Sequence, residues 1–96
     1  MTESFPSEEK FILTSQIRRA ALSISSNLAE GSSRKTPKDQ SHFTTMAYSS
    51  LMELLNQLII ANDLCYLNDS ELHHIRPEIE LLSNKLNSFR NSQFNK

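Results

Sequence analysis

Apolar residues recur at steps of three and four in three long segments, which is the spacing of helices that each bury a face. The segments cover about residues 8–30, 37–64 and 69–89. The chain has one glycine and three prolines, the residues that most often end a helix or a strand. A chain with so few of them favours a small number of long helices over many short strands. The pattern predicts an all-α fold with three long helices in a single domain, residues 1–96.

Local signals define the ends of the first helix and the start of the second. Ser7 is expected to cap the first helix, and Gly31, the only glycine, is expected to end it in a left-handed conformation. Thr36 followed by Pro37 is typical of a helix start, because a threonine oxygen accepts from a first-turn amide and proline suits the first helical position. The sequence therefore predicts a short polar loop between these two helices.

The third helix has an equally clear start. Asn68 and Glu71 have the spacing of a capping box, in which each side chain bonds the backbone amide of the other residue. Pro77 lies within this helix and lacks an amide donor, so we expect a kink or a break there. Apart from Phe94, residues beyond Arg90 are polar, and we expect them to be frayed.

The second helix is apolar around most of its circumference, so it needs neighbours on nearly every side. A chain of 96 residues buries only about 60–65% of the surface that its unfolded form exposes, and two further helices are too few to cover this one. These observations predict self-association into a homo-oligomer. The apolar positions are Phe43, Met46, Ala47, Leu51, Met52, Leu54, Leu55, Leu58, Ile59, Ile60, Ala61 and Leu64.

The net charge of −1 hides two blocks of opposite sign. Residues 10–38 contain six basic residues and one acidic residue, whereas residues 39–80 contain seven acidic residues and one basic residue. The basic block suits phosphate contacts with RNA or DNA through Arg18, Arg34, Lys35 and Lys38. It equally suits helices that attract each other within or between subunits.

A second set of polar residues lies near the apolar positions of the first two helices. The set comprises Arg19, Asn27, Glu30, Glu53 and Gln57. Arg19 and Glu30 are eleven residues apart, close to three full turns, and therefore share a helix face. We expect these residues to form a buried polar layer that fixes the register of the helices.

Features of an enzyme are missing. The lone cysteine, Cys65, has no recognisable activating base, and we expect a buried loop thiol. His42, His73, His74 and Glu78 lack a specific metal spacing, so we expect no metal, no cofactor and no small-molecule substrate. Without a signal peptide or an apolar run of about 20 residues, the chain is expected to be cytoplasmic, with no membrane contact.

Two blocks of sequence resemble the four-helix bundle family that is also called the 23S rRNA intervening-sequence proteins. They are LTSQIRRAALSI at residues 13–24 and SNLAEG at residues 26–31, and the resemblance continues through Arg34, Phe43, Glu53, Gln57 and residues 63–67. It implies an antiparallel up-and-down bundle that assembles into a ring, a pentamer in known relatives. In diversity-generating retroelements a related bundle is an accessory subunit whose basic surface contacts nucleic acid and the reverse transcriptase.

The chain departs from this family pattern at its start and in its loops. Relatives carry an additional helix before the Phe-Pro pair that appears here at residues 5–6, so most of the first of four helices is expected to be missing through a late start codon or a truncated gene copy. Ser33 and Cys65 occupy positions where relatives often have glycine. We therefore expect a non-enzymatic oligomeric scaffold or accessory factor that binds RNA or DNA through a basic helix-loop segment; the alternative is a purely structural interaction module.

Overall fold

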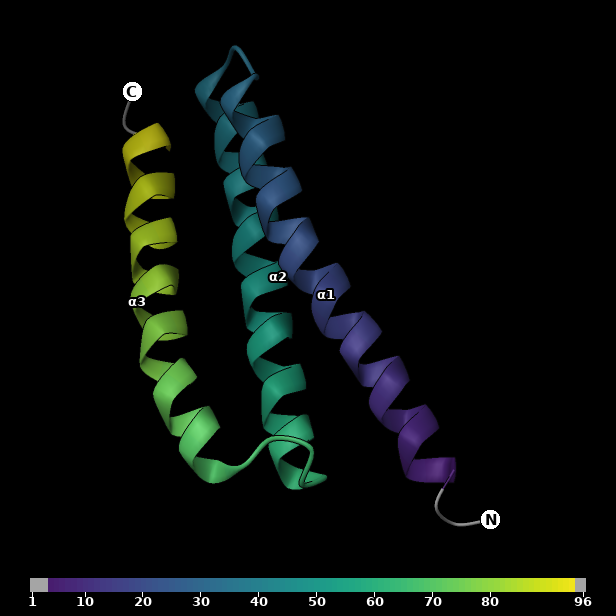
Figure 1. Ribbon diagram of the computed structural model, residues 1–96. Helices are drawn as coiled ribbons and strands as arrows, with labels where there is room; N and C mark the ends of the chain where they lie inside the picture. Colours follow the sequence, from purple (N-terminus) through teal and green to yellow (C-terminus); the bar gives the residue numbers. More distant parts are fainter. Residues whose placement is uncertain (1–3, 95–96) are drawn as a thin grey trace.

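The protein is a bundle of three helices. The computed structural model describes residues 4–94, with helix α1 at Ser4–Ser32, helix α2 at Pro37–Asp63 and helix α3 at Asp69–Phe94. The two loops lie at opposite ends, so consecutive helices are antiparallel, and α2 lies between α1 and α3 (Figure 1). The prediction of an all-α bundle with three long helices is confirmed.

The predicted starts of the second and third helices are both present. The hydroxyl of Thr36 accepts a hydrogen bond from the Asp39 amide at 3.1 Å, and Pro37 is the first residue of α2. At α3, the amide of Glu71 donates to Asn68 Oδ1 at 2.8 Å, and the amide of Asn68 donates to Glu71 Oε1 at 3.0 Å. The capping box is therefore complete, with asparagine in the position usually held by serine or threonine.

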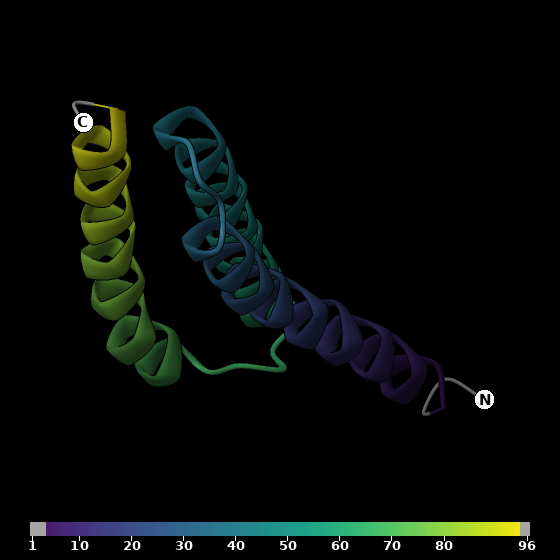
Figure 2. The same cartoon turned by 90° about the horizontal axis from the view of Figure 1, so that it is seen from above.

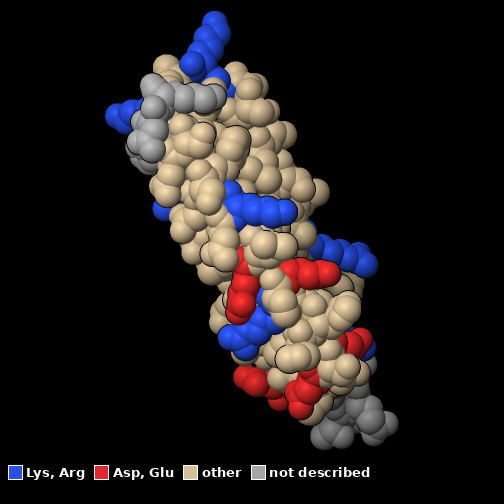
Figure 3. Space-filling model, turned by 90° about the vertical axis from the view of Figure 1, so that its left-hand side faces the viewer, with Lys and Arg blue, Asp and Glu red and all other residues tan. Residues whose placement is uncertain are grey.

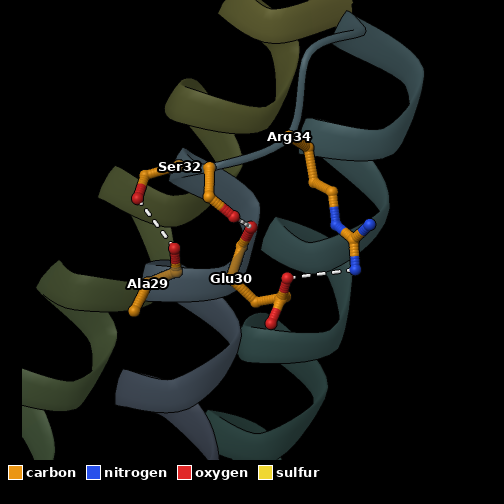
Figure 4. Close-up of polar contacts among 5 residues, drawn as sticks. Ala29, Glu30, Ser32 and Arg34 are labelled. Atoms are coloured by element: carbon orange, nitrogen blue, oxygen red, sulfur yellow. Dashed lines mark hydrogen bonds and ion pairs between the residues drawn. The ribbon is translucent and has the colours of Figure 1, made fainter.

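The predicted ends of α1 are wrong. The helix begins at Ser4, so Ser7 lies within it and does not precede it. Gly31 is helical, and no glycine in the described residues has a positive φ. The Ser32 and Ser33 hydroxyls donate at 2.8 Å to backbone carbonyls one turn earlier (Figure 4), so the last carbonyls are satisfied without a left-handed residue.

The break expected in α3 and the fraying expected beyond Arg90 are both absent. The helix continues through Pro77. Pro77 and His73 are both exposed, so water can bond the His73 carbonyl that has no helical donor. The helix also extends beyond Arg90 to Phe94, where buried Gln93 accepts a 2.8 Å hydrogen bond from Thr44 on α2.

The loop after α2 contains the left-handed residue that was expected after α1. Cys65 has a φ of 64°, and its amide donates to the Asn62 carbonyl at 3.0 Å. The amide of Tyr66 donates to the Ala61 carbonyl at 2.9 Å, which completes a Schellman motif. This turn directs Cys65 into solvent, so the expected burial of its thiol is wrong.

The core is small because α1 and α3 each pack against α2 but not against each other. In the described part of the chain, no Cα atoms of α1 and α3 lie within 8 Å. Figure 2 shows α1 and α3 on different sides of α2, with α1 diverging towards its N-terminal end. The buried apolar side chains that form the core cluster are Ile24, Ala47, Leu51, Ile79 and Leu86.

The resulting shape is long and thin. The radius of gyration is 16.0 Å and the dimensions are 56 × 23 × 12 Å. A compact chain of this length has a radius of gyration of about 12.5 Å. The thin shape leaves large apolar side chains of all three helices exposed.

Candidate nucleic-acid interface

The loop between α1 and α2 brings three basic residues together at one end of the bundle. We call this surface the basic end and define it as Arg34, Lys35 and Lys38. The Thr36 cap and Pro37 fix the direction in which the chain enters α2. Lys35 therefore lies just before the first turn of α2, and Lys38 lies within that turn.

Arg34 is already engaged by neighbouring groups. Its guanidinium forms a 3.0 Å ion pair with Glu30 (Figure 4) and lies 4.8 Å from the centre of the Phe43 ring. Its backbone carbonyl accepts a hydrogen bond from Gln40 at 3.0 Å. These contacts hold the loop against α2, but they also neutralise part of the charge that Arg34 would offer to a phosphate.

Lys35 and Lys38 have no ion-pair partner among the described residues, and both are exposed. They lie at the N-terminal end of α2, where free backbone amides carry partial positive charge. Next to Lys38 is an open hollow of about 510 Å³ lined by Pro37, Ser41, His42 and Thr45. These two lysines are therefore the side chains best placed to meet a phosphate backbone.

Arg18 does not belong to the basic end. It lies on α1 sixteen residues before Arg34, which corresponds to roughly 24 Å along the helix axis. Its side chain is exposed. The structure thus groups three of the four basic residues that the sequence suggested for phosphate contacts.

The expected polar layer is divided among separate local contacts. The Asn27 amide group donates to the Ser23 carbonyl and hydroxyl on its own helix, at 2.8 and 3.1 Å. The contact between helices comes instead from Ser23 and Ser50, whose hydroxyls are 2.8 Å apart. Glu30 pairs with Arg34 at the helix end and takes no part in this contact.

The remaining members of that set lie elsewhere on the first two helices. Gln57 is buried, and its amide group donates to Glu53 at 3.3 Å, while its own Oε1 atom has no partner. Arg19 is exposed and takes part in neither the Ser23–Ser50 contact nor the hydrogen bond between Gln57 and Glu53. The Ser23–Ser50 pair was missed from the sequence, because serines on two helices give no signal of which of them will meet.

The ends of the bundle differ in charge. On the face shown in Figure 3, Asp and Glu gather in the lower half. In the upper half, the charged residues that are visible are all Lys or Arg. Asp63, Asp69 and Glu71 lie at or beside the α2–α3 loop, the end opposite the basic end. On this face a polyanion would therefore be attracted more strongly to the upper half than to the lower half.

Two further kinds of feature were sought in the described residues, a metal site and a membrane-spanning helix. Within residues 4–94, no group of three His, Cys, Asp or Glu side chains is arranged to hold a metal ion. Helices α1, α2 and α3 all lack an apolar stretch long enough to cross a bilayer.

Comparison with known proteins identifies a family for this chain. No curated protein matches the chain. A family model described as "23S rRNA-intervening sequence protein" matches residues 1–88 of the 96 residues. Because this match covers nearly the whole chain, the protein belongs to the 23S rRNA-intervening sequence protein family.

Proposed function

We propose that this protein is a non-enzymatic, cytoplasmic accessory or scaffold subunit that self-associates and contacts RNA phosphates through the basic end. The observation that carries the nucleic-acid part is the pair of exposed lysines, Lys35 and Lys38, without ion-pair partners among the described residues at the start of α2. The family's name refers to ribosomal RNA, which favours RNA over DNA as the first ligand to test. Contacts of this kind recognise phosphate and not sequence.

Titration of a fluorescent RNA hairpin at several salt concentrations tests this proposal. Removing one phosphate contact lowers the slope of log K against log salt by about 0.9, so Lys35→Glu with Lys38→Glu should flatten the slope by roughly 1.8. We expect affinity at low salt to fall by at least about tenfold. Binding that does not depend on salt, or that survives this double change, would refute the phosphate contacts.

Lys10→Glu supplies the matched control. Lys10 is an exposed lysine near the other end of α1, far from the basic end, and the substitution changes charge in the same way. We expect this variant to reduce affinity much less than Lys35→Glu or Lys38→Glu alone, each of which changes the net charge by the same two units. A labelled DNA hairpin of the same sequence tells whether the basic end distinguishes the two polymers.

A second candidate function is a purely structural module that binds other protein chains. The observation that favours it is the exposure of large apolar side chains on α1, where Phe11 and Leu22 are 71% and 69% exposed. Light scattering during size-exclusion chromatography measures self-association directly, and the pentamer implied by the family resemblance is the stoichiometry to compare. If RNA binding is absent and the assembly is intact, this second function replaces the first.

A further inference from the structure

The open hollow beside the basic end has the size and shape of a site for a small group. The described residues that line it all belong to α2, and they are Pro37, Lys38, Ser41, His42 and Thr45. Their spacing of four places Lys38 and His42 in one row along the helix, and the other three in the next row. The volume of about 510 Å³ lies within the range of small-molecule sites, about 300–1,000 Å³. The hollow can therefore hold a group the size of one nucleotide.

His42 gives this hollow an exposed aromatic ring. The ring meets the ring of Phe43 edge-on, with centroids 5.4 Å apart and planes at 75°. Phe43 is half-buried and is also covered by the Arg34 guanidinium, 4.8 Å from the centre of its ring. Contact with this fixed neighbour limits the movement of the His42 ring. Histidine is one of the side chains on which unpaired RNA bases stack, so His42 offers a base a flat surface.

Lys38 is placed to meet the phosphate of the same nucleotide. It lies four residues before His42, which corresponds to roughly 6 Å along the helix axis. This distance is similar to the span from the phosphate to the base in one nucleotide. Lys38 is exposed and has no ion-pair partner among the described residues. A base stacked on His42 therefore leaves its phosphate within reach of Lys38.

The two hydroxyl groups in the hollow are hydrogen-bond acceptors for a ligand. The Ser41 hydroxyl donates to the Lys38 carbonyl at 3.0 Å, and the Thr45 hydroxyl donates to the Ser41 carbonyl at 2.9 Å. A hydroxyl group has one hydrogen and two lone pairs. Because both hydrogens are bonded within α2, each oxygen is left with lone pairs and no hydrogen for a ligand.

Two neighbouring acceptors favour a base that carries an exocyclic amino group. An amino group has two N–H bonds and can donate one to each oxygen. Cytosine carries such a group at N4, where uracil carries a carbonyl oxygen. The single ring N–H of uracil lies between two carbonyl oxygens, which would face the lone pairs of the hydroxyl groups. The hollow therefore favours cytosine over uracil.

From these features we infer that the hollow binds one unpaired nucleotide of an RNA chain. The phosphate lies at Lys38, the base stacks on His42, and an exocyclic amino group of the base donates to Ser41 and Thr45. This inference rests on the RNA contacts in the proposed function and names the kind of nucleotide that is bound. A base inside a duplex is paired and stacked, so the hollow takes nucleotides of single strands and loops.

Two labelled RNA octamers test the preference for a base, one of cytidine and one of uridine. Their phosphates and ring sizes are alike, so a difference in affinity at one salt concentration comes from the base edges. We expect the cytidine octamer to bind at least about threefold more tightly, the effect of one hydrogen bond. Ser41→Ala with Thr45→Val removes both hydroxyl groups and should abolish this preference. Equal affinity of the wild-type protein for the two octamers would overturn the inference, and so would a preference that survives the double change.

Replacing His42 tests the stacking contact. His42→Ala should weaken binding of the cytidine octamer by about tenfold. The slope of log K against log salt should not flatten, because no phosphate contact is removed. His42→Phe keeps an aromatic ring and should restore most of the affinity.

Two controls accompany this variant. His73→Ala removes an exposed histidine of α3 that lies near the opposite end of the bundle, and it should bind the octamer like the wild-type protein. A blunt RNA duplex should bind His42→Ala and the wild-type protein equally, because its bases do not reach the ring. If His42→Ala binds the octamer as tightly as His73→Ala, the stacking contact is absent and the inference is wrong.

The results also separate the inference from the function on which it rests. A protein that binds no RNA overturns both. RNA binding that Lys35→Glu with Lys38→Glu weakens, but that depends neither on His42 nor on the base, overturns the inference alone, because the basic end then contacts only phosphates. Far-UV circular dichroism shows whether each variant keeps its helices.

Discussion

Replacing Cys65 with glycine should stabilise the protein. Cys65 has a φ of 64° in the Schellman turn after α2, a conformation that costs a residue with a side chain about 1–2 kcal/mol. Glycine adopts it without this cost, but it also gives the unfolded chain extra freedom of about 0.4–1 kcal/mol. Because the thiol is exposed, little burial is sacrificed. The expected net gain in the free energy of unfolding is therefore about 0.5–1 kcal/mol.

Urea unfolding followed by far-UV circular dichroism measures this gain. All variants need the same protein concentration, because any self-association would add to apparent stability. Cys65→Ala is the control, since it removes the thiol but keeps a Cβ atom in the same conformation. Cys65→Val should be less stable than Cys65→Ala, because branched side chains fit a positive φ poorly. If Cys65→Gly is no more stable than Cys65→Ala, the turn does not carry the strain that its geometry indicates.

Three further substitutions should change the free energy of unfolding, and the same urea assay measures each of them. Gly31→Val should lower the free energy of unfolding by about 2 kcal/mol, because even an added Cβ would lie 3.0 Å from the Phe43 Cβ atom. An unchanged stability would contradict this close approach. Gln57→Leu should raise the free energy of unfolding by about 1 kcal/mol, since it removes a buried oxygen that has no partner. A decrease instead would show that the polar side chain stabilises the fold. Asn68→Ala should lower the free energy of unfolding by about 1 kcal/mol because the capping box is removed, and no change would mean that the box does not stabilise α3.

The helix starts at Pro37 and Asp69 were predictable from the sequence because their causes are local. The Thr36 cap and the Asn68–Glu71 box each join residues three positions apart, so the residues that make the bonds can be read directly from the chain. The all-α fold was predictable for a similar reason, since apolar spacing reports the helical period. The grouping of Arg34, Lys35 and Lys38 likewise follows from their closeness in sequence.

Other features depended on which surfaces met, and short-range patterns do not contain that information. Gly31 was expected to end a helix, but its lack of a side chain instead allows the close approach of Phe43 on α2. Residues near the C-terminus were expected to fray, but Gln93 is buried against Thr44, 49 residues away.

By itself the sequence determined the number of helices and the starts of α2 and α3. Only the tertiary structure decided that α1 and α3 stay apart, that Cys65 takes the left-handed turn, and that Arg34 is engaged by Glu30 and Phe43. The physical reason is the distance along the chain between the residues that interact. Hydrogen bonds within a turn depend on neighbouring residues, whereas packing depends on pairs of surfaces that only the folded chain brings together.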